Sequence, residues 1–198
     1  MFEGLKCFIF LDPQIEKVLT MLGGRMKEYT VKVFDDGAKE WFLNGKRHRE
    51  DGPAIERPNG YKAWCINGAL HRLDGPALEL SSGTKEYWVN GNLHRENGPA
   101  IEHSSGTKEW FLNGKHHRED GPAIEHSDGS KEYFINGFRH RENGPAVEYA
   151  DNSKCDYYIN GKFLTEKEFN NRNKKNISCA DKVVEIDGVK YKLVMVKE

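Results

Sequence analysis

Apolar residues along most of this chain occur in short runs that return at a fixed interval, with polar and glycine-containing segments between them. Asn-Gly pairs mark an interval of 23 residues, which lengthens by one residue before the sixth pair. The pairs begin at Asn44, Asn67, Asn90, Asn113, Asn136 and Asn160. A fixed period of this length predicts an array of stacked units rather than one globular core.

Each unit carries a conserved order of side-chain types around its Asn-Gly pair. The aromatic residues three positions earlier are Trp41, Trp64, Tyr87, Trp110, Tyr133 and Tyr157. An aliphatic residue stands one position before each pair, as Leu112 does. Positions two apart on a strand share a face, so the aromatic and the aliphatic side chains point the same way. The residue between them is also apolar, which predicts partial cover on the second face.

Turn residues divide each unit into short extended segments. Asn-Gly tolerates positive φ at both positions and predicts a tight hairpin turn. Gly-Pro-Ala follows eight residues after each of the first five Asn residues, and a glycine precedes each strand. Proline belongs at a bend or a strand start, because it cannot donate to a ladder. We expect an all-β fold, a single solenoid-like stack of β-hairpin repeats with short helices near both ends and a C-terminal β-hairpin.

The two ends lie outside the regular period. Residues 1–25 are predicted to be an extension with a short helix, because Asp12 could cap a helix that Pro13 begins. This segment could be dispensable, or it could cover the exposed first edge of the sheet. The array is expected over 26–164, with a first strand from Met26. Residues 165–180 are expected to hold a capping helix, from the Thr165/Glu168 capping-box pattern, and a polar linker, "NNRNKKNIS". Residues 181–198 predict a hairpin around Asp187-Gly188, either a small module or an added pair of strands.

Composition narrows the functional classes. Charged residues make up 31% of the chain and nearly cancel, at a net charge of −1, which gives no general attraction to polyanions. The cysteines are scattered without a C-x-x-C pair, which favours a reducing, cytoplasmic compartment. No apolar run approaches the roughly 20 residues that span a bilayer. We expect no cofactor.

The repeats "WFLNGKRHREDGPA", "WCINGALHRLDGPA" and "YWVNGNLHRENGPA" carry a family resemblance. They resemble MORN repeats, hairpin units of similar length, and more closely the N-G-x-x-H-R-x-D/N-G-P-A arrays of tailed phages and large DNA viruses. The resemblance covers most of the chain. It implies a hairpin array and an accessory protein of a virus or phage that acts in the host cytoplasm, where it inhibits or neutralises a host defence protein.

A column of histidines is the obvious candidate for a metal site. It comprises His48, His71, His94, His117 and His140. Two strands per unit would separate equivalent side chains by about 10 Å, too far for neighbours to share a zinc ion. We therefore expect no metal site and a structural role, in which each ring bonds the Gly-Pro bend of its own or the next unit.

A column of arginines raises the question of phosphate binding. It comprises Arg49, Arg72, Arg95, Arg118 and Arg141. Acidic residues lie beside every arginine, and the unit Lys108–Ser130 holds three Lys or Arg against five Asp or Glu. This balance favours an Arg-carboxylate ladder between units over phosphate binding. Repeated acid pairs argue against a unique catalytic site, so we expect no catalytic residues.

Positions that vary at a fixed place in the period are the candidates for recognition. They lie two and three residues after the Asn, and one residue after the glutamate that follows Gly-Pro-Ala. The predicted partner-binding residues are Lys46, Arg47, Leu70, Leu93, Lys115, His116, Phe138, Arg139, His103, His126 and Tyr149. Their mixture of cations and apolar groups suits a protein partner, although ordinary surface drift would give the same variation.

Three functions are open at this point. The first is a non-catalytic protein that binds a partner, expected to be a host protein, along one face. The second is binding of an anionic ligand, nucleic acid or a phospholipid headgroup, through the His-Arg columns, which we rank lower. The third is an enzyme that uses Cys7 or Cys179 near an end, ranked last because neither has a patterned base nearby.

Overall fold

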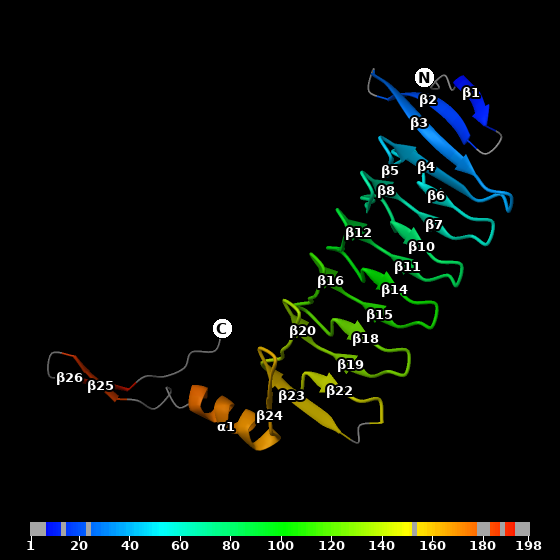
Figure 1. Cartoon of the computed structure of the whole chain (residues 1–198). Coiled ribbons are helices and arrows are strands. Elements are labelled where there is room, and N and C mark those ends of the chain that lie inside the picture. The colour runs from blue at the N-terminus through cyan, green and yellow to red at the C-terminus, as the bar shows by residue number, and fades with distance from the viewer. Residues whose placement is uncertain are drawn as a thin grey trace.

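The repeat units stack side by side into one elongated antiparallel sheet (Figure 1). The computed structural model describes residues 7–12, 15–22, 25–151, 154–177, 183–186 and 189–192, and side chains over 27–151, 154–172 and 189–190. Each full unit contributes two strands to the 16-stranded sheet. The predicted all-β hairpin stack is confirmed.

The long sheet follows the chain order almost without interruption. Its strands are β1 (Cys7–Asp12), β2 (Ile15–Leu22), β3 (Arg25–Val33), β4 (Lys39–Leu43), β6 (Ile55–Glu56), β7 (Lys62–Ala63), β10 (Leu78–Glu79), β11 (Lys85–Glu86), β14 (Ile101–Glu102), β15 (Lys108–Glu109), β18 (Ile124–Glu125), β19 (Lys131–Glu132), β22 (Val147–Glu148), β23 (Cys155–Ile159) and β24 (Lys162–Leu164), with β5 (Lys46–Arg47) beside β4. Neighbouring strands pair antiparallel.

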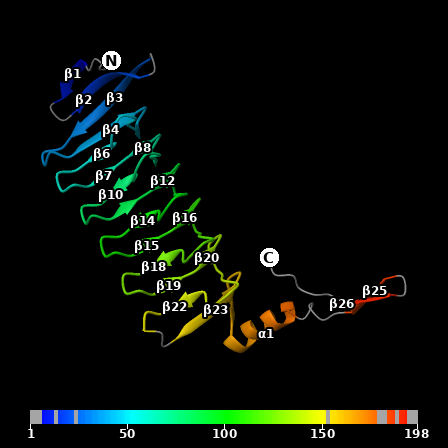
Figure 2. The ribbon, with the colours of Figure 1, turned by 180° about the vertical axis from the view of Figure 1, so that it is seen from behind.

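A second, smaller hairpin closes around each Asn-Gly pair. The separate small hairpins are β8 (Cys65–Ile66) with β9 (Ala69–Leu70), β12 (Trp88–Val89) with β13 (Asn92–Leu93), β16 (Phe111–Leu112) with β17 (Lys115–His116), and β20 (Phe134–Ile135) with β21 (Phe138–Arg139). The Asn residues have φ of 50 to 53° and the Gly residues 74 to 89°, as this turn requires. The small hairpins follow one edge of the array and the turns of the long hairpins the other (Figures 1 and 2).

The aromatic residue of each unit is the point where the chain leaves the long sheet for the small hairpin. The Trp110 N–H donates to the Ala123 carbonyl in the long sheet, at 2.8 Å. The Trp110 carbonyl instead accepts from the His117 N–H after the small hairpin, at 3.1 Å. One residue therefore serves two ladders, and the continuous apolar run divides into two short strands.

The core consists of small clusters that repeat from unit to unit. The alanine after each Gly-Pro is fully buried, and the next aliphatic residue is buried or nearly so. The buried alanines are Ala54, Ala77, Ala100, Ala123 and Ala146. Ala100 and Ile101 pack with Phe111 and with Leu93 of a small hairpin. Because each cluster lies within or between adjacent units, stability depends on stacking, as in other repeat proteins.

The N-terminal helix predicted from Asp12 and Pro13 is wrong. Ile15–Leu22 forms β2, which pairs along its whole length with β3. The local capping signals are outweighed because β3 would otherwise expose an unpaired edge, and pairing with β2 covers it. The predicted first strand is confirmed, as β3 begins at Arg25.

A helix follows the last unit, as predicted. It is α1 (Glu166–Ile177), and the Thr165/Glu168 capping box is confirmed, with the Glu168 N–H donating to Thr165 Oγ1 at 3.3 Å. Phe169 is buried and packs on Tyr157, 4.8 Å between ring centres. The predicted polar linker is wrong as far as Ile177, because helix continues through it.

The C-terminal hairpin forms as predicted. It consists of β25 (Val183–Ile186) and β26 (Val189–Lys192), which pair with each other in a two-stranded sheet of their own. The two turn residues, Asp187 and Gly188, lie outside the described residues.

Candidate functional site

Each column arginine lies over the aromatic ring of its own unit. The Arg118 guanidinium carbon is 4.1 Å from the centre of the Trp110 ring, and the other four arginines lie at 3.7 to 4.1 Å from theirs. Arg118 Nη1 also donates to the Pro122 carbonyl at 3.2 Å and to Glu125 at 3.0 Å. These arginines are therefore held by a ring, a bend carbonyl and a carboxylate at once.

The expected Arg-carboxylate ladder between units is wrong, because the described carboxylate partners belong to the arginine's own unit. Arg49 pairs with Asp51 and Glu56, and Arg95 pairs with Glu102 at 2.6 Å. The link to the next unit runs through the backbone, where the Arg118 N–H donates to the Phe134 carbonyl at 3.1 Å. The side chain thus fixes the Gly-Pro bend of one unit, and the main chain joins the units.

Each column histidine accepts a hydrogen bond from the next unit. The N–H of Asn113 donates to His94 Nδ1 at 3.2 Å, and the N–H of Asn136 donates to His117 Nδ1 at 3.1 Å. The same bond joins His48, His71 and His140 to the following Asn-Gly turn. The expected partner, the Gly-Pro bend, is therefore wrong. Since Nδ1 accepts in this bond, Nε2 is the ring atom that faces the loop acids.

Most of the variable positions contact a row of carboxylates on one face of the long sheet. Glu109 accepts hydrogen bonds from His103 and His116, each at 2.7 Å. The corresponding pairs are Arg47 with Glu40, His126 and Arg139 with Glu132, and Tyr149 with Asp156. The His116 bond lowers the pKa of Glu109, and the His103 bond adds to this effect.

Packing accounts for the side chain at the second variable position in some units, although Leu93 is apolar and stands seven residues after the carboxylate of Glu86. His116 also lies over Phe111, 3.9 Å between ring centres. In the unit where alanine replaces the carboxylate, at Ala63, the second variable residue is Leu70, which packs on the apolar cluster around Cys65. These contacts explain part of the variation by packing. Lys46, Lys115 and Phe138, at the first variable position, are exposed.

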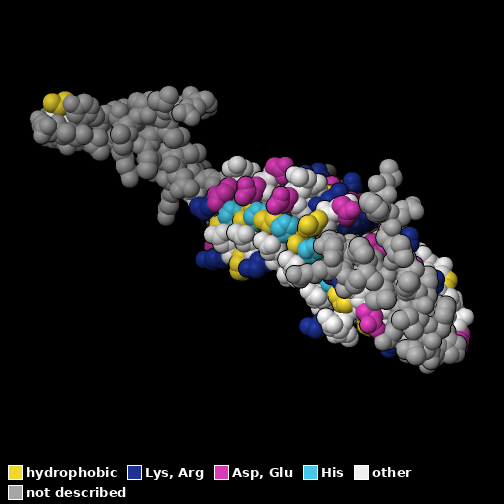
Figure 3. All heavy atoms as spheres, turned by 90° about the horizontal axis from the view of Figure 1, so that it is seen from above, with side chains coloured by type: hydrophobic (Ala, Val, Ile, Leu, Met, Phe, Trp, Pro, Cys, Tyr) yellow, Lys and Arg dark blue, Asp and Glu magenta, His cyan; other side chains and the backbone are white. Residues whose placement is uncertain are grey.

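A ridge of loops runs along the other side of the array, where each chain segment bends through Gly-Pro. We define the tip column as the residue after each column arginine. Its members are Glu50, Leu73, Glu96, Glu119 and Glu142. The Leu73 residue is 81% exposed, and the side chains of Glu96 and Glu119 are 78% and 85% exposed. Figure 3 shows acidic side chains in a row beside a row of histidines along the array.

A hollow opens between each pair of successive loops in the middle of the ridge. The one between the Leu73 and Glu96 loops is floored by Tyr87, Val89 and His94 and has a volume of about 690 Å³. Equivalent hollows of about 710 and 660 Å³ lie between the Glu96 and Glu119 loops and between the Glu119 and Glu142 loops. The ridge therefore presents the same cavity three times in succession.

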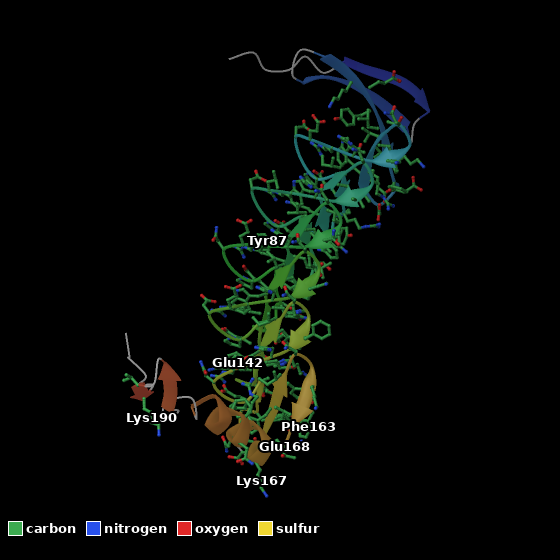
Figure 4. The ribbon with its side chains drawn as sticks, turned by 90° about the vertical axis from the view of Figure 1, so that its left-hand side faces the viewer. Tyr87, Glu142, Phe163, Lys167, Glu168 and Lys190 are labelled. Atoms are coloured by element: carbon green, nitrogen blue, oxygen red, sulfur yellow. The ribbon has the colours of Figure 1, made fainter. Side chains whose placement is uncertain are left out.

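The two end members of the tip column are already paired with cations from outside the regular repeats. Lys27, on β3, donates to Glu50, and Arg172, on α1, donates to Glu142 Oε2 at 2.6 Å. Each of these bonds lowers the pKa of its glutamate. Figure 4 shows Glu142 next to α1, the helix that also carries Lys167 and Glu168.

The three middle members, Leu73, Glu96 and Glu119, have no such cation among the described residues. The nearest positively chargeable groups to the two glutamates are His94 Nε2 at 4.0 Å and His117 Nε2 at 3.7 Å. This column was not among the positions predicted from the sequence. The available signal was Leu73, the one apolar residue at a position that is otherwise glutamate.

The structure gives little support to the other candidate sites. Among the described residues, no three His, Cys, Asp or Glu side chains come together in a way that could hold a metal ion. Cys179 lies outside the described residues, and for Cys7 only the backbone, in β1, is described. No helix in the described part of the chain has the length and apolar character needed to cross a membrane.

No family model matches the chain, and no curated protein matches it either. Function is therefore inferred from the geometry of the array.

Proposed function

We propose that this protein is a non-catalytic repeat scaffold that binds a protein partner along its loop ridge. The observation that supports this most directly is the row of three hollows between exposed loops, with Leu73 projecting at one end. A regular, open surface of this kind suits an extended partner, as concave faces do in other repeat proteins. Burial of the exposed Leu73 side chain against a partner would favour contact at this edge.

The alternative, an anionic ligand bound by the His-Arg columns, has less support. The column arginines are mostly covered, and each has a ring and a bend carbonyl as partners within its own unit. Exposed acids such as Asp74 and Glu119 stand beside them and would repel phosphate. An anionic ligand would have to displace these contacts.

The role of a viral or phage accessory protein that neutralises a host defence protein rests on the resemblance of the repeats alone. It remains our prediction for the biological setting, together with the cytoplasm of the host as the compartment. The exposed candidates Lys46, Lys115 and Phe138 lie on the small hairpins and would form a second contact edge.

Affinity capture tests the proposal. The tagged full chain and its Leu73→Glu variant would be incubated with lysate of a candidate host, and bound material would be identified by mass spectrometry. We expect a protein at near one-to-one ratio with the wild type and strong depletion with the variant. Asp128→Asn, which changes an exposed residue in the turn of a long hairpin and away from both proposed contact edges, is the matched control. Recovery of only nucleic acid or lipid would overturn the proposal.

A further inference from the structure

The tip column shows how the ridge accepts a cation. At each end of the array a basic side chain from a non-repeat segment pairs with a tip glutamate, Lys27 with Glu50 and Arg172 with Glu142. The Arg172 guanidinium also reaches the backbone carbonyl of Glu142, at 3.5 Å. These two segments are unrelated in sequence and in secondary structure, so the tip position itself selects for a cation.

In the middle of the tip column, two glutamates occupy the same position as Glu50 and Glu142, and the tip before them is apolar. Glu96 and Glu119 are exposed carboxylates, whereas the neighbouring column arginines are already neutralised by Glu102 and by Asp120 and Glu125. One unit earlier, the exposed Leu73 stands at the position that carries a glutamate in the other units. The open stretch is thus one apolar tip followed by two acidic tips.

The spacing of these tips restricts the shape of an occupant. Each unit adds two strands to the sheet, so successive tips are about 10 Å apart. An extended chain advances about 3.3 Å per residue, and a polyproline II helix about 3.1 Å with three residues per turn. In both cases every third residue comes into register with the next tip, and in polyproline II those residues also point the same way.

We propose that the open tips Leu73, Glu96 and Glu119 bind an extended basic segment of a partner protein with the pattern apolar-x-x-basic-x-x-basic. The apolar side chain packs on Leu73, and the two basic side chains lie at the mouths of the hollows and pair with Glu96 and Glu119. These two ion pairs would reproduce the one that Arg172 forms with Glu142. This inference rests on the proposed function and specifies the chemistry of the partner.

Fluorescence anisotropy with synthetic peptides and the full-length protein tests this pattern. The probe is a fluorescein-labelled peptide with the core Leu-Pro-Pro-Arg-Pro-Pro-Arg, made also in the reverse order because the direction of binding is open. The control isomer, Leu-Pro-Pro-Pro-Arg-Arg-Pro, has the same composition and charge but places neither arginine three or six residues from the leucine. We expect one of the two spaced orders to bind about tenfold more tightly than the isomer at low salt, since the isomer cannot form the two rim ion pairs while its leucine lies on Leu73.

Two variants locate the binding on the protein. Leu73→Glu, and the double change Glu96→Gln with Glu119→Gln, should each weaken the spaced peptide by about tenfold, with unchanged melting, because these side chains are exposed. Asp128→Asn removes one exposed acid from the turn of a long hairpin, at the opposite edge, and should leave affinity unchanged. Equal affinity for the spaced and clustered peptides, or no effect of the ridge variants, would overturn the inference.

The peptide experiment can fail without contradicting the proposed function, which the lysate capture tests separately. If neither spaced peptide binds but the lysate still yields a protein that Leu73→Glu fails to capture, the ridge is a protein-binding surface and the basic pattern is wrong. If a labelled oligonucleotide binds and the peptides do not, both proposals are overturned.

Discussion

The guanidinium of Arg118 occupies the space that a side chain at position 121 would need. A Cβ atom built on Gly121 would lie 2.9 Å from Arg118 Cζ, closer than such atoms approach. The guanidinium is held there by the Trp110 ring and the Pro122 carbonyl. The glycine of Gly-Pro-Ala is therefore required by the arginine three residues before it, and the arginine and glycine columns depend on each other.

Gly121→Ala should consequently destabilise the array. We expect a loss of about 1 to 3 kcal/mol, the usual cost of forcing extra volume into a packed site. The chain contains a matched control, because a Cβ on Gly144 would approach Arg141 Cζ only to 3.4 Å. Thermal or urea melting of both variants would check this, and an equal loss at the two positions would contradict the explanation.

Replacement of His94 by alanine should weaken the junction between two units. It removes the acceptor of the Asn113 N–H, and a typical lost hydrogen bond costs about 1 kcal/mol. Hydrogen exchange should become faster at the Asn113 turn while distant units stay protected. Lys115→Ala, at an exposed position, is the control. Loss of partner capture with an unchanged melting curve would instead assign His94 to recognition.

The Glu109 contacts predict a contribution to stability that acid removes. The pKa of Glu109 in the folded protein is lowered from 4.5, chiefly by the His116 hydrogen bond. The ionised carboxylate therefore stabilises the fold fully above pH 4.5, and this contribution disappears as the pH falls through the lowered pKa. In melts between pH 7 and 3, the stability difference between wild type and Glu109→Gln should shrink on acidification. A constant difference would contradict the assignment.

The capping box should control how well α1 closes the array. Thr165→Ala removes the acceptor of the Glu168 N–H and should cost about 1 kcal/mol. The expected signature is faster hydrogen exchange in the first turn of α1, with little change in the middle units. Lys167→Ala alters an exposed side chain in the same turn without touching the cap. Equal exchange in the two variants would show that Phe169 packing alone holds the helix.

Local chemistry made much of this fold predictable. The Asn113-Gly114 turn needs positive φ at both positions, which only a few residue types allow, so the sequence marks it directly. The same holds for Thr165 with Glu168, whose bonds lie within one turn. The 23-residue period then predicts stacking, because a single hairpin buries too little to be stable alone.

Predictions from local sequence signals failed where contacts with a neighbouring element favoured a different structure. Asp12 and Pro13 are good helix-start residues, yet the segment after them pairs with β3 over eight residues. The polar stretch after Phe169 has the composition of a linker, but it continues the helix that Phe169 anchors on Tyr157. In both cases tertiary contacts outweighed propensity.

The sequence by itself determined the repeat, its turns and the residue types in each column, because these follow from backbone conformation and from a period visible in the letters. Only the tertiary structure decided which partner each column serves. His117 bonds a turn in the next unit, Arg118 stays within its own, and Glu96 is left without the cation that Glu142 receives from Arg172. Such choices depend on distances between units and on what lies at the two ends of the stack, and no pattern within a single repeat contains them.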